Sequence, residues 1–127
     1  MRLPMRRGPA TRLAALAATA GLLLSSGCGP KDPGQRVWAR KCAACHGREG
    51  RGNTRFARSR PYANLTDDVW KHGGDLPSIR RLITDGDPKS PMPAYRDRLS
   101  PEEIDAVSRH VLSLWARAHG TPVPEAK

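Results

Sequence analysis

Two cysteines and a histidine, in the segment Cys42-Ala43-Ala44-Cys45-His46, constrain this chain more than any other feature. The cysteines lie three positions apart, and the histidine follows the second one directly. Three chemistries use cysteines at this spacing: a structural zinc site, a redox-active dithiol and the covalent attachment of a haem. Each of them requires different partners elsewhere in the chain, so the remaining sequence can discriminate between them.

The rest of the chain favours haem attachment. A structural zinc site needs four ligands, usually in two pairs, but the chain has only one more cysteine, Cys28, and its other histidines are not spaced as a pair. A thioredoxin-like dithiol would lie in a βαβ unit, and no segment alternates like a strand. Two thiols that add to the vinyl groups of one porphyrin, with an imidazole beside them for the iron, match the observed spacing. We therefore expect one covalent haem on Cys42 and Cys45, with His46 as the proximal iron ligand.

The first 27 residues are typical of a secretory signal. Four arginines precede the apolar run LAALAATAGLLL at 13–24, and small residues lead from this run into Cys28. The run is too short for a membrane-spanning helix. The junction resembles the lipobox of bacterial lipoproteins, in which the cysteine is lipidated, although Ser25 stands where leucine is usual. Either Cys28 is lipidated and anchors the protein, or an ordinary cleavage occurs near the same point. Both alternatives predict an exported, periplasmic or extracytoplasmic protein in which residues 28–31 are a tether.

Charge and composition describe a small basic domain. The leader contains 4 of the 22 basic residues and none of the 12 acidic ones, which leaves the mature chain six charges positive. No aromatic-studded basic stripe is present, so we expect an acidic protein partner and no nucleic acid. With one Phe, two Tyr and three Trp, the domain has few large residues for a core. A large apolar cofactor would supply the missing interior.

Capping signals predict an all-α domain over residues 32–119, followed by a flexible tail at 120–127. Pro and Gly interrupt the chain between the expected helices. The segment Asp32-Pro33-Gly34-Gln35 begins a first helix, and Ser100-Pro101-Glu102-Glu103 is a capping box that begins the last. The expected helices cover about 32–47, 66–70, 76–85 and 100–115.

Met92 is the expected second iron ligand. It is the only methionine outside the leader, and Pro91 and Pro93 hold it on an irregular segment that suits a fixed ligand better than a core filler. Three histidines are weaker alternatives, because His72 is expected to be exposed or to support the site, His110 to pack, and His119 to lie near a frayed end.

The mature chain resembles class I c-type cytochromes over roughly residues 34–115. Gly34 and Trp38 precede the cysteine motif by eight and four residues, and glycines follow it. The segments Asn64-Leu65-Thr66-Asp67 and Met92-Pro93-Ala94-Tyr95, with the final helix, are similar to the cytochrome modules of the dihaem subunit of C-family haem-copper oxidases. A single haem motif corresponds to one module. Two positions depart from the family: Ala63 replaces a proline whose carbonyl orients the proximal histidine, and His110 replaces a tyrosine.

The resemblance implies a small cytochrome c fold packed around one haem c, with His46 and Met92 as axial ligands. It implies an electron carrier between respiratory redox partners and not an enzyme. Two alternatives stay open: a relay subunit of an oxidase or dehydrogenase complex, and a haem peroxidase or gas-binding site if Met92 does not ligate. The basic residues near the motif either form a docking face or are merely solvated: Arg40, Lys41, Arg48, Arg51, Arg55 and Arg58.

Overall fold

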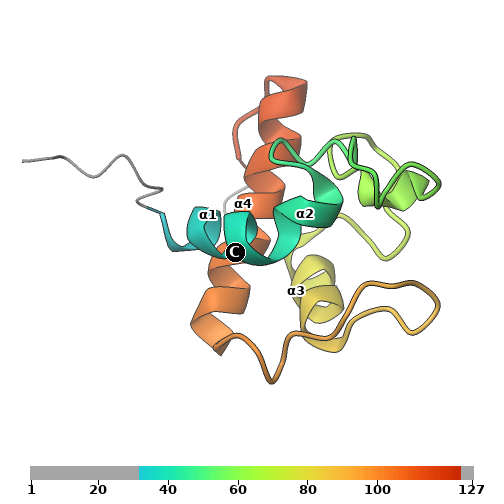
Figure 1. The fold of residues 1–127 in the computed structure, drawn as a ribbon. Helices are drawn as coiled ribbons and strands as arrows, with labels where there is room; N and C mark the ends of the chain where they lie inside the picture. The colour runs from blue at the N-terminus through green and yellow to red at the C-terminus, as the bar shows by residue number, and fades with distance from the viewer. Residues whose placement is uncertain (1–31, 124–127) are drawn as a thin grey trace, which may run out of the picture.

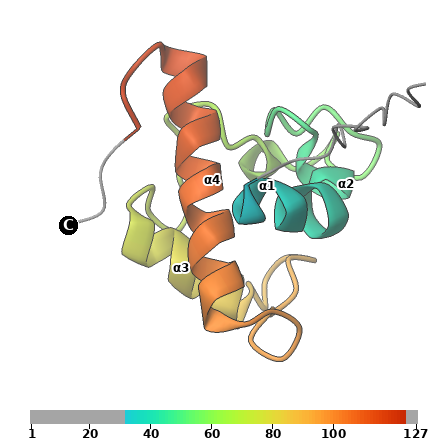
Figure 2. The same cartoon turned by 90° about the vertical axis from the view of Figure 1, so that its left-hand side faces the viewer.

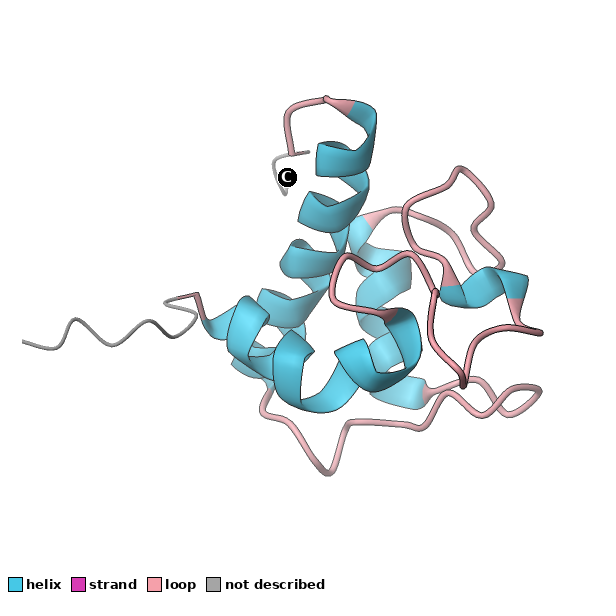
Figure 3. Cartoon of the chain, turned by 45° about the horizontal axis from the view of Figure 1, so that its top comes forward, coloured by secondary structure: helices cyan, strands magenta, loops and turns pink. Residues whose placement is uncertain are grey.

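The computed structural model describes residues 32–123, and within this range the chain is helical with no strand (Figure 3). The predicted all-α class is therefore confirmed. The leader, the tether and Cys28 lie outside the described residues. No helix between residues 32 and 123 combines the length and apolarity needed to cross a membrane.

The first helical region is continuous in the chain but changes its winding. It consists of α1 (Pro33–Val37), the π-helical segment η1 (Trp38–Cys42) and α2 (Ala43–His46). As predicted, Asp32 caps the start, where its carboxylate accepts a hydrogen bond from the Gln35 amide at 2.9 Å. The π-helical turn was not predicted: the Ala43 amide donates to the Trp38 carbonyl, five residues back.

The long C-terminal helix α4 (Pro101–His119) crosses the first region (Figures 1 and 2). Its predicted capping box is formed, because Ser100 and Glu103 exchange side-chain and backbone hydrogen bonds. The crossing is close at Gly34, where a β-carbon would lie only 2.2 Å from the Ala106 carbonyl oxygen. This approach buries Val37 and Val107, which are 1% and 0% exposed, at the centre of the core.

Helix α3 (Leu76–Asp85) also packs against α4 and completes the core. Asp75 caps it by accepting a hydrogen bond from the Ser78 amide at 2.9 Å. Its buried face is apolar, as predicted: Leu76, Ile79 and Ile83. The helix ends before Gly86, and an irregular segment at 87–99 leads to α4.

The prediction of a short helix at 66–70 is wrong. Residues 66–68 form bends and residues 69–70 have no regular structure, because side chains take the amides that a helix would need. Asn64 accepts from the Thr66 amide at 3.0 Å, and Asp67 accepts from the Val69 amide at 3.0 Å. The chain instead makes a short 3-10 helix just before, η2 (Pro61–Ala63).

Candidate functional site

The two thiols of the motif lie at the junction of η1 and α2. The Cys42 side chain is partly buried against the core, whereas Cys45 is exposed. Burial, with the neighbouring Cys45, raises the pKa of the Cys42 thiol to about 11. A redox dithiol uses a thiolate whose pKa is lowered, so the environment of Cys42 is unlike that of a thioredoxin-type motif.

The imidazole of His46 has a fixed orientation. Its Nδ1 lies 2.8 Å from the carbonyl oxygen of Ala63, which can only accept, so Nδ1 carries the proton and Nε2 keeps its lone pair. Burial lowers the pKa of the His46 imidazole, and the hydrogen bond to Ala63 partly offsets this shift. The ring is thus neutral at pH 7, in the tautomer that binds a metal through Nε2.

Backbone contacts bring Ala63 to His46. The Gly52 amide donates to the His46 carbonyl and the Leu65 amide donates to the Gly50 carbonyl, each at 2.7 Å. Gly52 has φ +65°, and a β-carbon on it would lie 2.9 Å from the Asn64 nitrogen. The sequence left open which carbonyl orients His46. Ala63 does so with its main chain, which requires no proline at that position.

Trp38 supports the same imidazole from within the core. Its ring centroid lies 5.8 Å from that of His46 and 5.6 Å from that of His110. Its indole nitrogen donates to the Arg48 carbonyl at 3.0 Å. His110 is 7% exposed and packs, as predicted, and burial lowers the pKa of its imidazole.

Met92 lies on the irregular segment after α3, partly buried against the same core cluster as Cys42. Its amide donates to the Ser90 hydroxyl at 3.2 Å, and its carbonyl accepts from the Asp87 amide at 3.1 Å. Just beyond it, the Tyr95 hydroxyl donates to the Lys41 carbonyl at 3.0 Å. This bond joins the segment that carries Met92 to the helical region that carries the thiols.

Two of the remaining histidines have partners elsewhere. His72 is exposed, which is one of the two expectations for it, and donates from Nε2 to the Asp87 carboxylate at 3.0 Å. His119 ends α4, where it stacks on Trp115 with ring centroids 4.4 Å apart. The sequence did not single out Asp87. Hydrogen bonds from Lys71, the Lys89 amide and His72 hold the pKa of its carboxyl well below the usual range.

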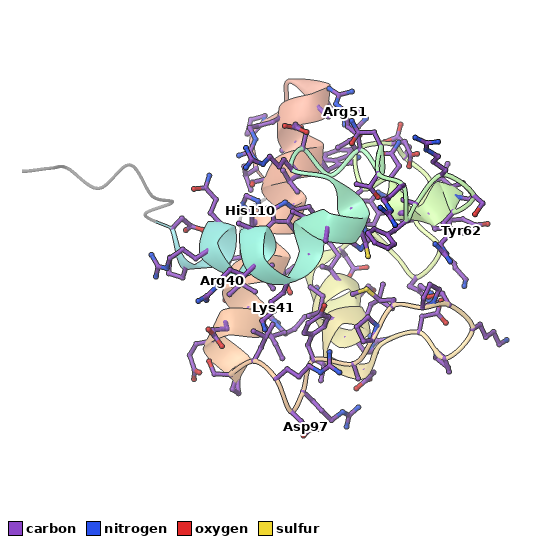
Figure 4. The ribbon with its side chains drawn as sticks, in the orientation of Figure 1. Arg40, Lys41, Arg51, Tyr62, Asp97 and His110 are labelled. Atoms are coloured by element: carbon purple, nitrogen blue, oxygen red, sulfur yellow. The ribbon has the colours of Figure 1, made fainter. Side chains whose placement is uncertain are left out.

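The basic residues around the motif do not share one face. All six are exposed, but Arg40 and Lys41 lie on one side of the first helical region and Arg51 lies on the other (Figure 4). In the loop after Gly47, Arg55 lies over the exposed ring of Phe56, 5.2 Å from its centroid. The first helical region therefore separates Arg51, in the loop, from Arg40 and Lys41.

The residues of the site suit a haem c. Two thiols three positions apart can bind the porphyrin, and a neutral imidazole with a free Nε2 and a thioether can bind its iron. Cys42 and Met92 belong to a set of partly buried apolar side chains that pack against the core and stay partly exposed, together with Ala43, Leu65 and Trp70. Such side chains can pack against a flat apolar ring.

Comparison with known proteins agrees with this chemistry. Residues 29–111 match the family model described as cytochrome C oxidase, cbb3-type, subunit III. The chain is 39% identical over 94 residues to the cbb3-type cytochrome c oxidase subunit FixP of Azorhizobium caulinodans. This match covers 70% of this chain and 30% of the relative. It is 37% identical to the corresponding subunit CcoP of Rubrivivax gelatinosus, over 70% of this chain and 29% of that protein. This chain thus spans less than a third of the length of these relatives.

Among solved structures, cytochrome c6 of the diatom Phaeodactylum tricornutum superposes with a TM-score of 0.56 at 30% identity. The match covers 68% of this chain and 94% of the cytochrome. The helical domain is thus a small c-type cytochrome fold, and the chain belongs to the family of subunit III of cbb3-type cytochrome c oxidases.

Proposed function

We propose that this chain is an exported electron-transfer cytochrome that carries one haem c on Cys42 and Cys45, with His46 and Met92 as the iron ligands. The hydrogen bond between His46 Nδ1 and the Ala63 carbonyl carries the proposal, because it leaves Nε2 available directly beside the two thiols. A bound haem c supplies an iron centre that gains and loses one electron. The chain's own residues hold that group, exclude water from it and set the strength of its ligands.

Covalent attachment is the first point to test. Each thiol adds across one vinyl group, so that its S–H bond is replaced by a C–S bond and the proton moves to the neighbouring vinyl carbon. The exported protein should retain haem after acid–acetone extraction and a denaturing gel. The variant with both Cys42→Ala and Cys45→Ala should lose it, whereas Ala44→Ser, which changes an exposed position between the two thiols, should not. One equivalent of zinc and no haem in the unmutated protein would contradict the proposal.

Met92 decides between a carrier and an enzyme. With imidazole and thioether both bound, no coordination position is open to oxygen or peroxide, and the thioether raises the reduction potential. Met92→Ala should abolish the near-infrared sulfur-to-iron band, lower the potential and allow carbon monoxide to bind the reduced protein. Lys89→Ala, an exposed change in the same segment, should retain the band. An unmutated protein that already binds carbon monoxide readily at neutral pH would instead support the peroxidase or gas-binding alternative.

A relay role inside a larger assembly is the second candidate. The relatives FixP and CcoP are named as subunits of cbb3-type oxidases, and this chain corresponds to less than a third of their length. A free carrier must dock and separate at each turnover, so salt should slow its reaction with an acidic partner. A fixed relay should be indifferent to salt. The exposed loop arginines, Arg48, Arg51, Arg55 and Arg58, are the residues we propose for docking.

We further propose that lipid on Cys28 anchors the mature protein to a membrane. The support is the order of basic, apolar and small residues before Cys28. The domain over residues 32–123 has no spanning helix of its own. A lipid anchor would keep the cytochrome at a membrane surface, where respiratory partners reside.

A further inference from the structure

Asp87 is a nearly buried carboxylate with an unusually complete set of partners. Its side chain is 6% exposed. One oxygen, Oδ2, accepts from Lys71 Nζ at 2.8 Å and from His72 Nε2 at 3.0 Å, and the other accepts from the Lys89 amide at 2.9 Å. Lys71 and His72 lie before α3, whereas Asp87 lies after it. The carboxylate therefore joins two segments on opposite sides of that helix in the sequence.

The main chain of Asp87 controls the backbone at Met92. Its amide donates to the Met92 carbonyl at 3.1 Å, and its carbonyl accepts from the Ser90 amide at 3.0 Å. Ser90 in turn accepts from the Met92 amide. Both polar groups of the Met92 backbone thus depend on the turn that Asp87 begins. We call residues 86–95, in the irregular segment that follows α3, the Met92 loop (Figure 1).

Gly86 makes this arrangement possible. It has φ +71°, and a β-carbon at this position would lie 2.9 Å from the Met92 carbonyl oxygen and 2.7 Å from the Ala94 nitrogen. The loop therefore folds back closely on the end of α3, and the Tyr95 amide bonds to the Ile83 carbonyl at 3.0 Å. One end of the loop is tied to α3 by backbone contacts. The Asp87 carboxylate, near the start of the loop, holds it to Lys71 and His72.

Lys71 extends the connection towards the opposite side of the site. Its ammonium nitrogen lies 5.8 Å from the ring centroid of Tyr62, the residue that precedes Ala63 in η2. Ala63 is the acceptor for His46. A short series of contacts thus runs from the loop of the proposed thioether ligand, through Asp87 and Lys71, to the segment that orients the imidazole.

We propose that Asp87 is a positioning residue that holds the Met92 loop in the conformation in which the thioether reaches the iron. This inference rests on the ligand role proposed for Met92. The carboxylate acts through charge and hydrogen bonds, so an amide cannot replace it. In Asp87→Asn the side chain keeps one acceptor oxygen and loses its charge. It can then accept from the Lys89 amide or from Lys71 Nζ but not from both, because its NH2 group faces the other donor.

The test measures how firmly Met92 holds the iron in the haem-loaded protein. Free imidazole competes with the thioether for oxidised iron, and its binding removes the near-infrared band. In Asp87→Asn we expect the affinity for imidazole to rise about tenfold, because a charge-assisted contact to the loop is lost. The reduction potential should fall, while the far-ultraviolet circular dichroism and the covalent haem content stay unchanged.

Asp97→Asn is the matched control. Asp97 is an exposed carboxylate in the turn that follows the Met92 loop, and the substitution is chemically the same (Figure 4). It should bind imidazole like the unmutated protein. A double variant, Lys71→Met with His72→Leu, removes both side-chain donors from exposed positions and leaves the loop sequence intact. It should raise the imidazole affinity in the same direction, even if Asp87→Asn fails to fold.

Equal imidazole affinity and an unchanged band in Asp87→Asn and in the double variant would overturn the inference. So would a double variant that matches Asp97→Asn while Asp87→Asn merely unfolds. Failure of the underlying ligand assignment has a different outcome, since the unmutated protein would then lack the sulfur-to-iron band altogether and Met92→Ala would change nothing.

Discussion

Replacement of Gly34 by alanine tests the packing on which the site rests. The added methyl group would lie 2.2 Å from the carbonyl oxygen and 2.8 Å from the carbonyl carbon of Ala106. Normal contact between such atoms is about 3.5 Å, so α1 and α4 would have to separate by roughly 1 Å. Main-chain atoms of a helix cannot rotate away as a flexible side chain can. The two helices would therefore move apart along the whole of their contact.

The magnitude follows from two opposing effects. Overpacking in a tight interior costs about 1–3 kcal/mol, and a gap of up to about 1 Å forfeits a quarter to a half of each dispersion contact that it opens. Val37 and Val107, both at the crossing, would lose such contacts. Alanine regains about 0.5–1 kcal/mol of helix propensity. We expect a net loss of about 2 kcal/mol, which for a domain of this size lowers the melting temperature by about 10 °C.

Thermal unfolding of the haem-loaded protein, followed by far-ultraviolet circular dichroism, measures this effect. Gln35→Ala is the control, because Gln35 is exposed in the same helix and its substitution should change the stability by no more than about 0.5 kcal/mol. A Gly34→Ala protein that melts within about 2 °C of the unmutated one would refute the reasoning. It would mean that the two backbones are not in contact at this point.

Three further predictions concern charge and location. If the loop arginines dock an acidic partner, Arg48→Glu with Arg51→Glu should flatten the salt dependence of the electron-transfer rate in stopped-flow mixing. The equal charge change of Arg40→Glu with Lys41→Glu, on the other side of the helical region, should have a smaller effect. Burial lowers the pKa of His110 from 6.5, so the unfolded chain takes up the proton before the folded chain does, and the free energy of unfolding should fall as the pH falls through about 6.5. Denaturant titrations at several pH values should show that this free energy depends less on pH in His110→Tyr. Cys28→Ser should move the haem protein from the membrane fraction to the soluble fraction, and an unmodified N-terminus in the unmutated protein, read by mass spectrometry, would remove the anchor.

Local chemistry predicted most of the helices. Asp32, Ser100 and Glu103 act through neighbours within three residues, so their capping roles could be predicted from the sequence, and the structure confirms them. The wrong helix at 66–70 has the same physical origin. The side chains of Asn64 and Asp67 can cap a helix or close a turn with nearly the same geometry, and only the path of the chain around His46 selects the turn.

The sequence predicts less of the site where the site depends on backbone contacts between residues that are far apart in the chain. The sequence indicated that some carbonyl orients His46, but the choice of Ala63 depends on how closely Gly52 approaches it. Asp87 gave no signal, since its partners Lys71 and His72 are about 15 positions away and become neighbours only when α3 folds. The attachment of haem to the two thiols and the ligand roles of His46 and Met92 stay predictions.

The π-helical turn at η1 sets the angular phase of the cysteine motif. Its wider winding accommodates one more residue than an α-helical turn would, and one residue of α-helix corresponds to about 100° of rotation. The face of α1 that meets α4 and the face of α2 that presents Cys45 and His46 are therefore offset by about a quarter of a turn from those of an unbroken helix. Deletion of exposed Ala39 would restore regular winding and swing the motif away from Ala63. The number of residues between Gly34 and Cys42 is thus itself constrained, and an insertion or deletion there would rotate the motif without replacing any residue that contacts it.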